Sequence, residues 1–214
     1  MPFLRLKGLL HPKPSHAIML LDNLNLTNLL HEKHIVDSEG GGDMSKFFSG
    51  IENQVVYPIL IKNNGKSYLT LYYYTSRADS ILHKDAECIL YFQSQAEMEV
   101  FCTRNELTIE SDVVVYDFDT PITNPIDYTR ILDNWNLLNT VASTLGMFFE
   151  GDLKKYNSLY DLLFRLNTPV EPIPPTYNIG KKQFNYLLKI FRKRERFFQR
   201  FEKLNIIDYI SSIR

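Results

Sequence analysis

Two carboxylates, Asp117 and Asp119, stand at the end of an apolar run that begins at Val113. Carboxylates at a strand end can in general bind Mg²⁺ or act as a nucleophile or an acid/base group. Two simpler interpretations exist. The carboxylates cap the turn that starts at Thr120, or they form an acidic edge that a partner protein contacts.

The catalytic interpretation rests on a resemblance to haloacid-dehalogenase-like phosphotransferases, to whose later acidic motif Gly151-Asp152 is also similar. The family's Gly-Thr after the second Asp is Thr120-Pro121 here, and Tyr156 stands where a second metal carboxylate would fall. We also expect antiparallel hairpins before the motif, where that family has a parallel βαβ unit. We therefore expect no enzyme and no catalytic residue, and we keep a Mg-dependent phosphotransferase-like enzyme as an alternative.

Other chemistries have little support in the sequence. Only His83 lies beyond residue 43, which is thin support for a Ser-His or Cys-His nucleophile. The chain has no Cys-x-x-Cys pair, and Gly40-Gly41-Gly42 is not followed by Lys-Ser/Thr, so we expect neither a metal nor a cofactor. Cys88 and Cys102 are expected to be buried thiols, with a disulfide as the alternative.

Charge is unevenly distributed along the chain. Residues 1–43 carry four Lys or Arg against five Asp or Glu, residues 44–178 carry ten against 17, and residues 179–214 carry ten against three. The middle segment is therefore acidic and the last segment basic. Such a division bears on partners and self-association rather than on the fold.

The basic segment alternates cations with aromatic and aliphatic residues, which predicts a helix with one cationic and one apolar stripe. Three interpretations stay open: the stripe packs on the acidic body of the chain or of a second copy, it binds nucleic acid, or it lies on an anionic membrane surface. If it binds nucleic acid, we expect Arg192, Arg194 and Arg196 to make the contacts.

We expect three segments. Residues 1–43 are either an untranslated leader, with the native start at Met44, or an N-terminal extension with a helix from Ala17 to Leu30. Residues 44–178 form the core domain, and residues 179–214 form a basic amphipathic helical tail packed on it. No apolar run approaches the roughly 18 to 20 residues of a membrane span, and no signal peptide is recognisable, so we expect a cytoplasmic protein.

An α+β fold is predicted, with a small, mostly antiparallel sheet of about four strands in residues 54–118. Strands are expected over 55–62 and 67–75, joined by Asn63-Asn64-Gly65, and over 87–93 and 113–118, with a helical or irregular segment over 76–86. Pro58 lacks an N–H, so it is expected where the first strand lies at a sheet edge or at a bulge.

Helices are expected to cover the sheet. The first is capped by Ser94 and Glu97, with Ala96, Val100 and Phe101 on its apolar side. Longer helices are expected over 127–149, from Gly151 onward, over 180–203 and over 205–213, with a Pro-rich connector over 168–176. On the 127–149 helix, the apolar stripe is Ile131, Trp135, Leu138, Ala142, Leu145 and Phe149.

This layout resembles small bacterial immunity proteins of polymorphic or contact-dependent toxin systems. The similarity covers about residues 50–175: the hairpin from Val55 to Tyr74, the helix capped near Ser94, the acidic strand end, and the segment from Trp135 to Leu163. It implies a cytosolic protein, a monomer or a homodimer, that binds and blocks a cognate toxin, often a basic nuclease. We therefore expect an acidic partner-binding face made by Asp117, Asp119, Asp127, Glu97 and Glu99.

Overall fold

The computed structural model describes residues 51–76, 78–84, 87–123, 126–167 and 179–212. The chain divides into two units, Met1–Met44 and Ser45–Arg214, and every described residue belongs to the second. The expected leader or N-terminal helix and the expected connector over 168–176 lie outside the described residues.

A hairpin begins the described chain, as predicted. Strand β1 (Ile51–Asn63) pairs antiparallel with β2 (Lys66–Thr75), in a register that runs from Asn63 opposite Lys66 to Val56 opposite Tyr73. Asn64 and Gly65 both have positive φ, 53° and 70°, as a type I′ turn requires. An Asn-Gly pair adopts this conformation at low cost, so the hairpin is set by local sequence.

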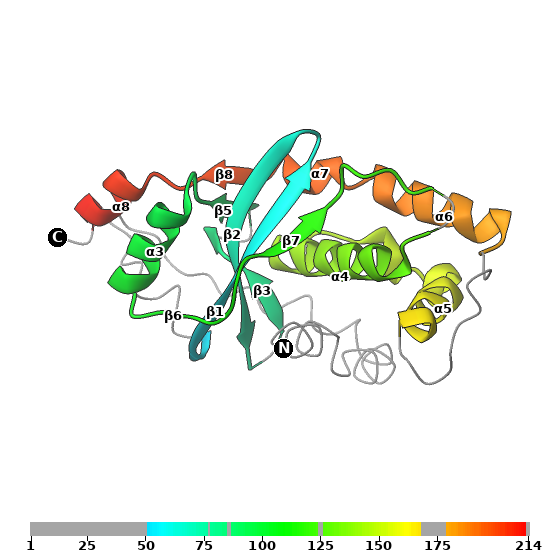
Figure 1. Cartoon of the computed structure of the whole chain (residues 1–214), viewed down its shortest axis with the longest axis horizontal. Helices are drawn as coiled ribbons and strands as arrows, with labels where there is room; N and C mark the ends of the chain where they lie inside the picture. The colour runs from blue at the N-terminus through cyan, green and yellow to red at the C-terminus, as the bar shows by residue number, and fades with distance from the viewer. Residues whose placement is uncertain (1–50, 77, 85–86, 124–125, 168–178, 213–214) are drawn as a thin grey trace. The chain divides into compact units, whose positions relative to one another are not determined.

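Strand β1 is central in a five-stranded sheet (Figure 1). On its other side it pairs in parallel with β6 (Thr108–Ile109) at Val55 and Val56, and with β7 (Val114–Asp117) from Ile59 onward. Beyond β2, strand β3 (Asp79–Ile81) continues the sheet, where an irregular segment was expected. The sheet therefore mixes antiparallel and parallel pairs, and the strand that carries Asp117 runs parallel to β1.

The prediction that Pro58 places its strand at a sheet edge or a bulge is wrong. Pro58 is buried opposite Leu71, and the register shift of β1 lies earlier, between Ile51 and Val56. Glu110 donates its N–H to Val56 O, so the backbone N–H and C=O of Val56 face β6 and β7. In a strand every second residue faces the same way, so the backbone of Pro58 faces this side too. Because Pro58 lies between the residues paired with β6 and those paired with β7, no ladder hydrogen bond needs its missing N–H.

A second sheet has three strands, β4 (His83–Lys84), β5 (Cys88–Tyr91) and β8 (Phe201–Lys203). Strand β5 matches the strand expected over 87–93. Strand β8 pairs with it in parallel, with Ile89 opposite Phe201, although it belongs to the tail that was expected to be helical. Thus eight strands are described, about twice the expected number, and the fold is α+β.

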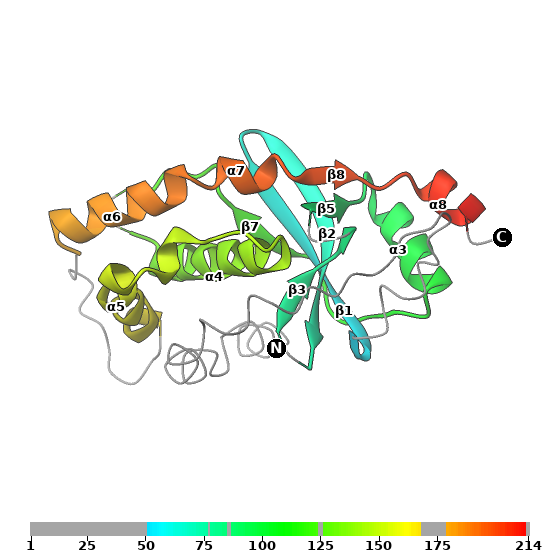
Figure 2. The same ribbon diagram turned by 180° about the vertical axis from the view of Figure 1, so that it is seen from behind.

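Helices lie on both sides of the hairpin (Figures 1 and 2). Helices α3 (Gln95–Arg104) and α8 (Ile206–Ser212) lie together on one side, where Tyr209 OH donates to Asn105 Oδ1. The larger group on the other side comprises α4 (Tyr128–Thr144), the short 3-10 turns η3 (Glu150–Asp152) and η4 (Lys154–Tyr156), α5 (Asn157–Asn167), α6 (Lys181–Arg192) and α7 (Glu195–Phe198).

Helix α3 has the predicted cap but a different buried face. Ser94 Oγ accepts from the N–H of Glu97 at 3.2 Å. The buried side chains are Met98, Phe101 and Cys102, whereas the expected apolar residues Ala96 and Val100 are exposed, Val100 by 43%. Burial raises the pKa of the Cys102 thiol to about 12, and both cysteines are free and buried, as expected.

All six residues of the predicted stripe are buried, but α4 ends at Thr144, five residues early, so Leu145 and Phe149 lie beyond the helix. Gly146, with φ of 59°, lies just after the helix end, and the N–H groups of Gly146 and Met147 donate to Ser143 O and Ala142 O. These two bonds form a Schellman motif, which satisfies the last carbonyls of the helix and turns the chain away.

The helix expected over 180–203 is also wrong. The chain forms α6, then a break at Lys193 and Arg194, then α7 and the strand β8. Helix α6 buries Leu187, Ile190 and Phe191, and the segment after it buries Phe197 and Phe198. A continuous helix would not bring Phe201 beside Ile89, so sheet pairing overrides the helical periodicity.

Candidate binding site

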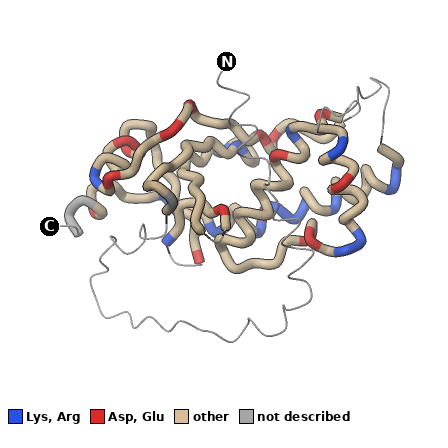
Figure 3. The backbone as a smooth tube through the Cα atoms, turned by 90° about the horizontal axis from the view of Figure 1, so that it is seen from below, with Lys and Arg blue, Asp and Glu red and all other residues tan. Residues whose placement is uncertain are grey.

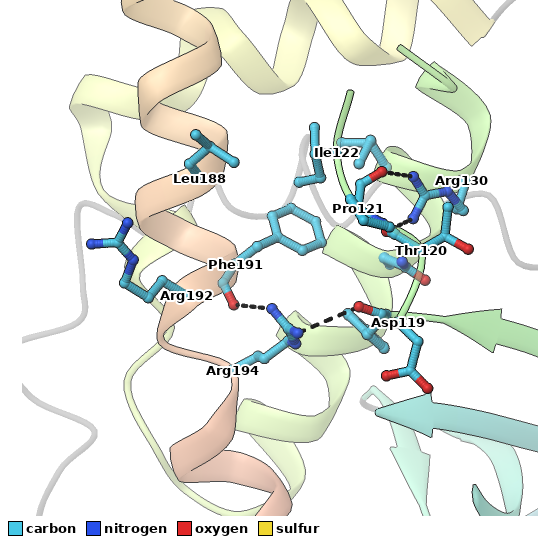
Figure 4. A pocket seen from close by; sticks show the side chains of 12 residues that line it. Asp119, Thr120, Pro121, Ile122, Arg130, Leu188, Phe191, Arg192 and Arg194 are labelled. Atoms are coloured by element: carbon cyan, nitrogen blue, oxygen red, sulfur yellow. Dashed lines mark hydrogen bonds between the residues drawn. The ribbon is translucent and has the colours of Figure 1, made fainter. Parts of the chain in front are cut away.

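A pocket lies where the end of β7, helix α4 and helix α6 meet (Figure 4). Its volume is about 390 Å³, within the range of small-ligand sites. We call residues 118–122, which leave β7 and cross this region, the strap. The lining residues are the five of the strap, Arg130, Ile131 and Asn134 from α4, and Leu188, Phe191, Arg192 and Arg194 from α6 and the residues after it.

Asp117 closes the turn at the start of the strap. One carboxylate oxygen accepts from the N–H of Asp119 at 2.8 Å and of Thr120 at 3.2 Å, and the other accepts from Thr120 Oγ1 at 2.5 Å. These bonds, the hydroxyl bond of Thr120 first, lower the pKa of Asp117. Both oxygens of the candidate nucleophile are thus engaged in the turn, as the capping interpretation predicts.

Arg130 holds the strap from the α4 side. Its Nη1 donates to Thr120 O at 2.8 Å and to Asp117 O at 3.3 Å, and its Nη2 donates to Pro121 O at 3.1 Å. Three carbonyls in a short, non-repetitive segment are thereby satisfied by one planar guanidinium, whose fork geometry suits several acceptors at once. Arg130 therefore fixes the path of the strap.

Arg194 holds the strap from the other side (Figure 4). Its Nη2 lies 3.4 Å from Phe118 O and its Nη1 3.0 Å from Phe191 O, while its Nε donates to Asn63 Oδ1 at 2.7 Å. Asn63, only 2% exposed, also donates through Nδ2 to Glu195. The tip of the β1–β2 hairpin, the strap and the tail are therefore joined through one arginine.

Asn134 gives the pocket a buried polar group. It is 1% exposed, and its Nδ2 donates to Asp117 O at 2.8 Å. Its Oδ1 has no hydrogen-bond partner among the residues that the structure describes. An unpaired buried acceptor is costly, so this atom is free to accept from a donor other than the described residues.

Apolar side chains form the remaining wall. The Phe191 ring points toward Pro121 and Ile122 of the strap, and Leu188 lies one turn before Phe191 on α6 (Figure 4). Phe191 is buried, whereas Leu188 is 36% exposed and lies at the mouth. The pocket thus combines an apolar wall with fixed guanidinium groups.

Three of the five expected acidic residues are brought together at this corner. Asp119 is exposed and accepts from the N–H of Gly65 at 3.2 Å, and Asp127 is exposed and caps α4 by accepting from the N–H of Arg130 at 3.0 Å. Asp117 lies between them, in the turn. Each carboxylate has a local role, and Asp119 and Asp127 remain open to solvent.

The other two, Glu97 and Glu99, are not part of this corner. Both lie on α3, on the opposite side of the hairpin from α4 and α6 (Figures 1 and 2). Glu97 accepts from the N–H of Gln93 at 2.8 Å, and Glu99 accepts from Gln95 Nε2 at 2.8 Å. The five residues therefore do not form one continuous acidic face.

The three arginines of the nucleic-acid alternative differ in their surroundings. Arg194 is bound into the strap, and Arg196 donates to Phe148 O and packs its guanidinium over the Phe197 ring. Arg192 is exposed and, in Figure 4, points away from Phe191 and the strap. Of the three, Arg192 is therefore the residue best placed to contact a ligand from solvent.

The cations of α6 lie mainly on its solvent side, on Lys181, Lys182, Lys189, Arg192 and Lys193. In the view of Figure 3, most Lys and Arg positions lie over the half that contains α4, α5 and α6. Lys193 pairs with Glu150, and the neighbouring cations lower the pKa of that carboxyl, with the Lys193 hydrogen bond as the main cause. This ion pair links the tail to the body, and the tail also contributes buried apolar side chains.

Arg130, Asn134 and Asn63 were not expected to act in a site. Arg130 and Asn134 lie four residues apart on α4, which places them on one face of the helix, and this spacing was the available signal. Asn63 had been interpreted only as a turn residue. No group of three or more His, Cys, Asp or Glu side chains is placed to hold a metal ion within the described ranges, and none of the helices searched there is long and apolar enough to cross a membrane.

No protein-family model matches the chain, and no curated protein matches it. A solved structure, described as the crystal structure of the SatS C-terminal domain in complex with bromine, is similar with a TM-score of 0.49 and 16% sequence identity. The similarity covers 78% of this chain and 100% of that one. A likeness of this size implies neither a shared family nor a shared function.

Proposed function

We propose that this chain is a non-catalytic binding protein that neutralises a cognate protein toxin in the bacterial cytoplasm, and that the corner around the strap contacts the toxin. The observation that supports it most is the exposure of two carboxylates near a pocket with an apolar wall: Asp119 lines the pocket, and Asp127 caps the helix turn that carries the lining residue Arg130. Charged groups around an apolar anchor pocket are the usual anatomy of a specific protein interface.

The rigidity of the corner supports the same proposal. Arg130 and Arg194 fix the strap backbone from two sides, and the turn hydrogen bonds fix Asp117. A preorganised surface loses little conformational freedom when a partner binds, so more of the interaction free energy appears as affinity. Exposed carboxylates also steer a basic partner, such as a nuclease domain, during encounter.

The test begins with capture of the partner from the native host by the whole chain, followed by measured association rates for the purified pair. The variant Asp119→Asn/Asp127→Asn removes two charges, while Asn still caps a helix and still accepts from Gly65 N–H. We expect association to slow by roughly tenfold at low salt and less at high salt.

The matched control is Glu97→Gln/Glu99→Gln, which removes the same charge on α3. Equal effects of the two double variants would show that only net charge matters and would refute the corner as the contact surface. Capture of nucleic acid alone, with no protein at stoichiometric amounts, would refute the toxin-binding proposal itself.

A second candidate is binding of nucleic acid by α6, and the cationic solvent face of that helix favours it. Loss of Lys189 and Arg192, both exposed, would then weaken binding and flatten its salt dependence by about two phosphate contacts. The control Lys84→Gln/Lys154→Gln removes two exposed cations elsewhere. Binding that falls equally in both variants would exclude α6 as a specific site.

A further inference from the structure

Two of the three arginines that line the pocket, Arg130 and Arg194, carry charge that their hydrogen-bond partners do not neutralise. Arg130 donates to three carbonyl oxygens, and Arg194 donates to two carbonyls and the amide oxygen of Asn63. All six acceptors are neutral. Such acceptors fix a guanidinium in place and leave its positive charge available.

Of the carboxylates near these arginines, Glu195 forms an ion pair with Arg194, 3.6 Å from Nε, and does not line the pocket. Of the lining residues that the structure describes, Asp119 is the one carboxylate, and it accepts from Gly65. Asp117 accepts from the strap turn. The pocket lining therefore keeps a positive balance.

Each guanidinium also has N–H donors that bond to no described residue. An arginine side chain has five N–H donors, and the bonds above engage three of them in Arg130 and three in Arg194. The remaining donors are Nε and one Nη2 hydrogen in Arg130, and one hydrogen on each Nη of Arg194. An oxyanion accepts several such bonds at once, which a neutral ligand atom does not.

The lining adds two further requirements for a ligand. Asn134 Oδ1 calls for an N–H or O–H donor, because it is buried and without a partner among the described residues. The wall made by Ile122, Leu188 and Phe191 calls for an apolar group. A ligand that meets all three conditions has an oxyanion, a nearby donor and an apolar side chain.

We infer that this pocket binds the C-terminal residue of a protein chain, with an apolar side chain against Phe191, the carboxylate beside the two arginines, and the amide N–H toward Asn134 Oδ1. A peptide C-terminus is the common structure in which these three groups are held within a few bonds of one another. The inference rests on the proposed function, since the toxin would present this residue.

The test uses the whole chain and a tetrapeptide, acetyl-Gly-Gly-Ser-Leu, followed by nuclear magnetic resonance. We expect the side-chain signals of Asn134 and the Nε–H signals of Arg130 and Arg194 to shift. The same peptide with a C-terminal amide keeps the apolar side chain and loses the charge, and it should bind at least tenfold more weakly. Equal binding of acid and amide would overturn the inference.

A variant places a competing carboxylate in the pocket. Leu188 is partly exposed at the mouth, so Leu188→Glu leaves the core intact and offers a tethered anion to the arginines. We expect tenfold or greater loss of peptide binding, whereas Ile207→Glu, the same kind of change at an exposed site on α8, should have no effect. Ile122→Glu, from the strap, provides a second variant if Leu188→Glu lowers stability.

Failure of this inference can be told apart from failure of the proposed function. If the tetrapeptide acid does not bind, the C-terminal site is refuted, whether or not acetyl-leucine binds. Toxin binding that depends on Asp119 and Asp127 would then still stand. If the peptide binds and no toxin is captured, the pocket inference stands and the proposed function is refuted.

Discussion

Arg194 shows how one side chain can decide the geometry of a site. It connects the hairpin tip at Asn63, the strap at Phe118 and the end of α6 at Phe191. Sequence reasoning placed it in a cationic stripe for nucleic acid, because periodicity gives no sign that α6 ends at Arg192 and that Arg194 turns inward. Its structural role follows only from tertiary contacts.

Arg194→Met should lower the free energy of unfolding by about 2 kcal/mol, since Asn63 Oδ1 is then left buried without its donor. Arg192→Met, two residues earlier and exposed, should change it by less than about 0.5 kcal/mol. Urea denaturation of both variants checks the difference. Similar values for the two would show that Arg194 does not hold the strap.

Asp117 makes stability depend on pH in a defined direction. Its pKa is lowered from the ordinary value of 3.8, chiefly by the Thr120 hydroxyl, so the folded chain favours the ionised form. The stabilisation is therefore complete above about pH 4 and is lost as the pH falls through the lowered pKa of the folded state. At neutral pH the stabilisation is fully present, and its pH dependence lies on the acid side.

In Asp117→Asn this contribution should be missing at every pH. The difference in unfolding free energy between the native chain and the variant should therefore shrink as the pH is lowered from 5 to about 2.5. Denaturation curves over this range give the measurement. A difference that stays constant would mean that the turn is held by Arg130 rather than by the carboxylate.

Two glycines show how a loop positions an element. Gly146 needs its positive φ to end α4, and a Cβ there would meet nothing within 4 Å. Gly151 has no such φ, but a Cβ would lie 2.3 Å from Phe149 Cε1 and 2.9 Å from Trp135 Cε2. Gly146 is needed for its backbone conformation, whereas Gly151 is needed because it lacks a Cβ, which lets η3 pack close to Phe149 and Trp135.

Gly146→Ala should therefore cost about 1 kcal/mol, the price of a left-handed alanine. Gly151→Ala should cost more, about 2 to 3 kcal/mol, because Phe149 and Trp135 must both shift. The Trp135 fluorescence spectrum should change in Gly151→Ala only. An unchanged spectrum with full stability would show that this packing relaxes freely.

The sequence predicted the elements that carry a local signal, such as a turn pair, a helix cap or an apolar stripe. The Asn64-Gly65 turn, the Ser94 cap and the apolar stripe of α4 were all recognisable. The structure departs from expectation where distant pairing decides: Pro58 in a central strand, and β8 in a segment with helical periodicity. Such pairings depend on residues far away in the sequence, which a single sequence does not indicate.

The candidate site was predictable only where its residues are close together in the sequence. Asp117, Asp119 and Asp127 are close in sequence and do meet at one corner, whereas Glu97 and Glu99, grouped with them by charge alone, do not. The pocket itself needs α6 beside the strap. No spacing in the sequence predicts that contact.

At the scale of the whole described unit, the tail is part of the fold rather than an appendage. Phe198 contacts Tyr68 of β2, Phe118 of the strap and Phe201 of β8 through ring pairs 5.2 to 5.9 Å apart. Aromatic burial on this scale contributes several kcal/mol. Removal of the tail should therefore affect both sheets.

Phe198→Ala should lower the free energy of unfolding by about 3 to 5 kcal/mol, and calorimetry should still show one transition for strands and tail together. The exposed Phe148→Ala provides the control and should cost under about 1 kcal/mol. Two separate transitions, with the tail melting first, would instead support an independent tail.

The pairing of β8 with β5 also has a consequence during protein synthesis. Cys88–Tyr91 is made long before Phe201–Lys203, so the growing chain shows β5 with one edge unpaired until the tail emerges from the ribosome. An open edge is a template for wrong partners. We therefore expect truncated nascent chains that end between α5 and β8 to associate with chaperones or aggregate, and the completed chain to be released from both.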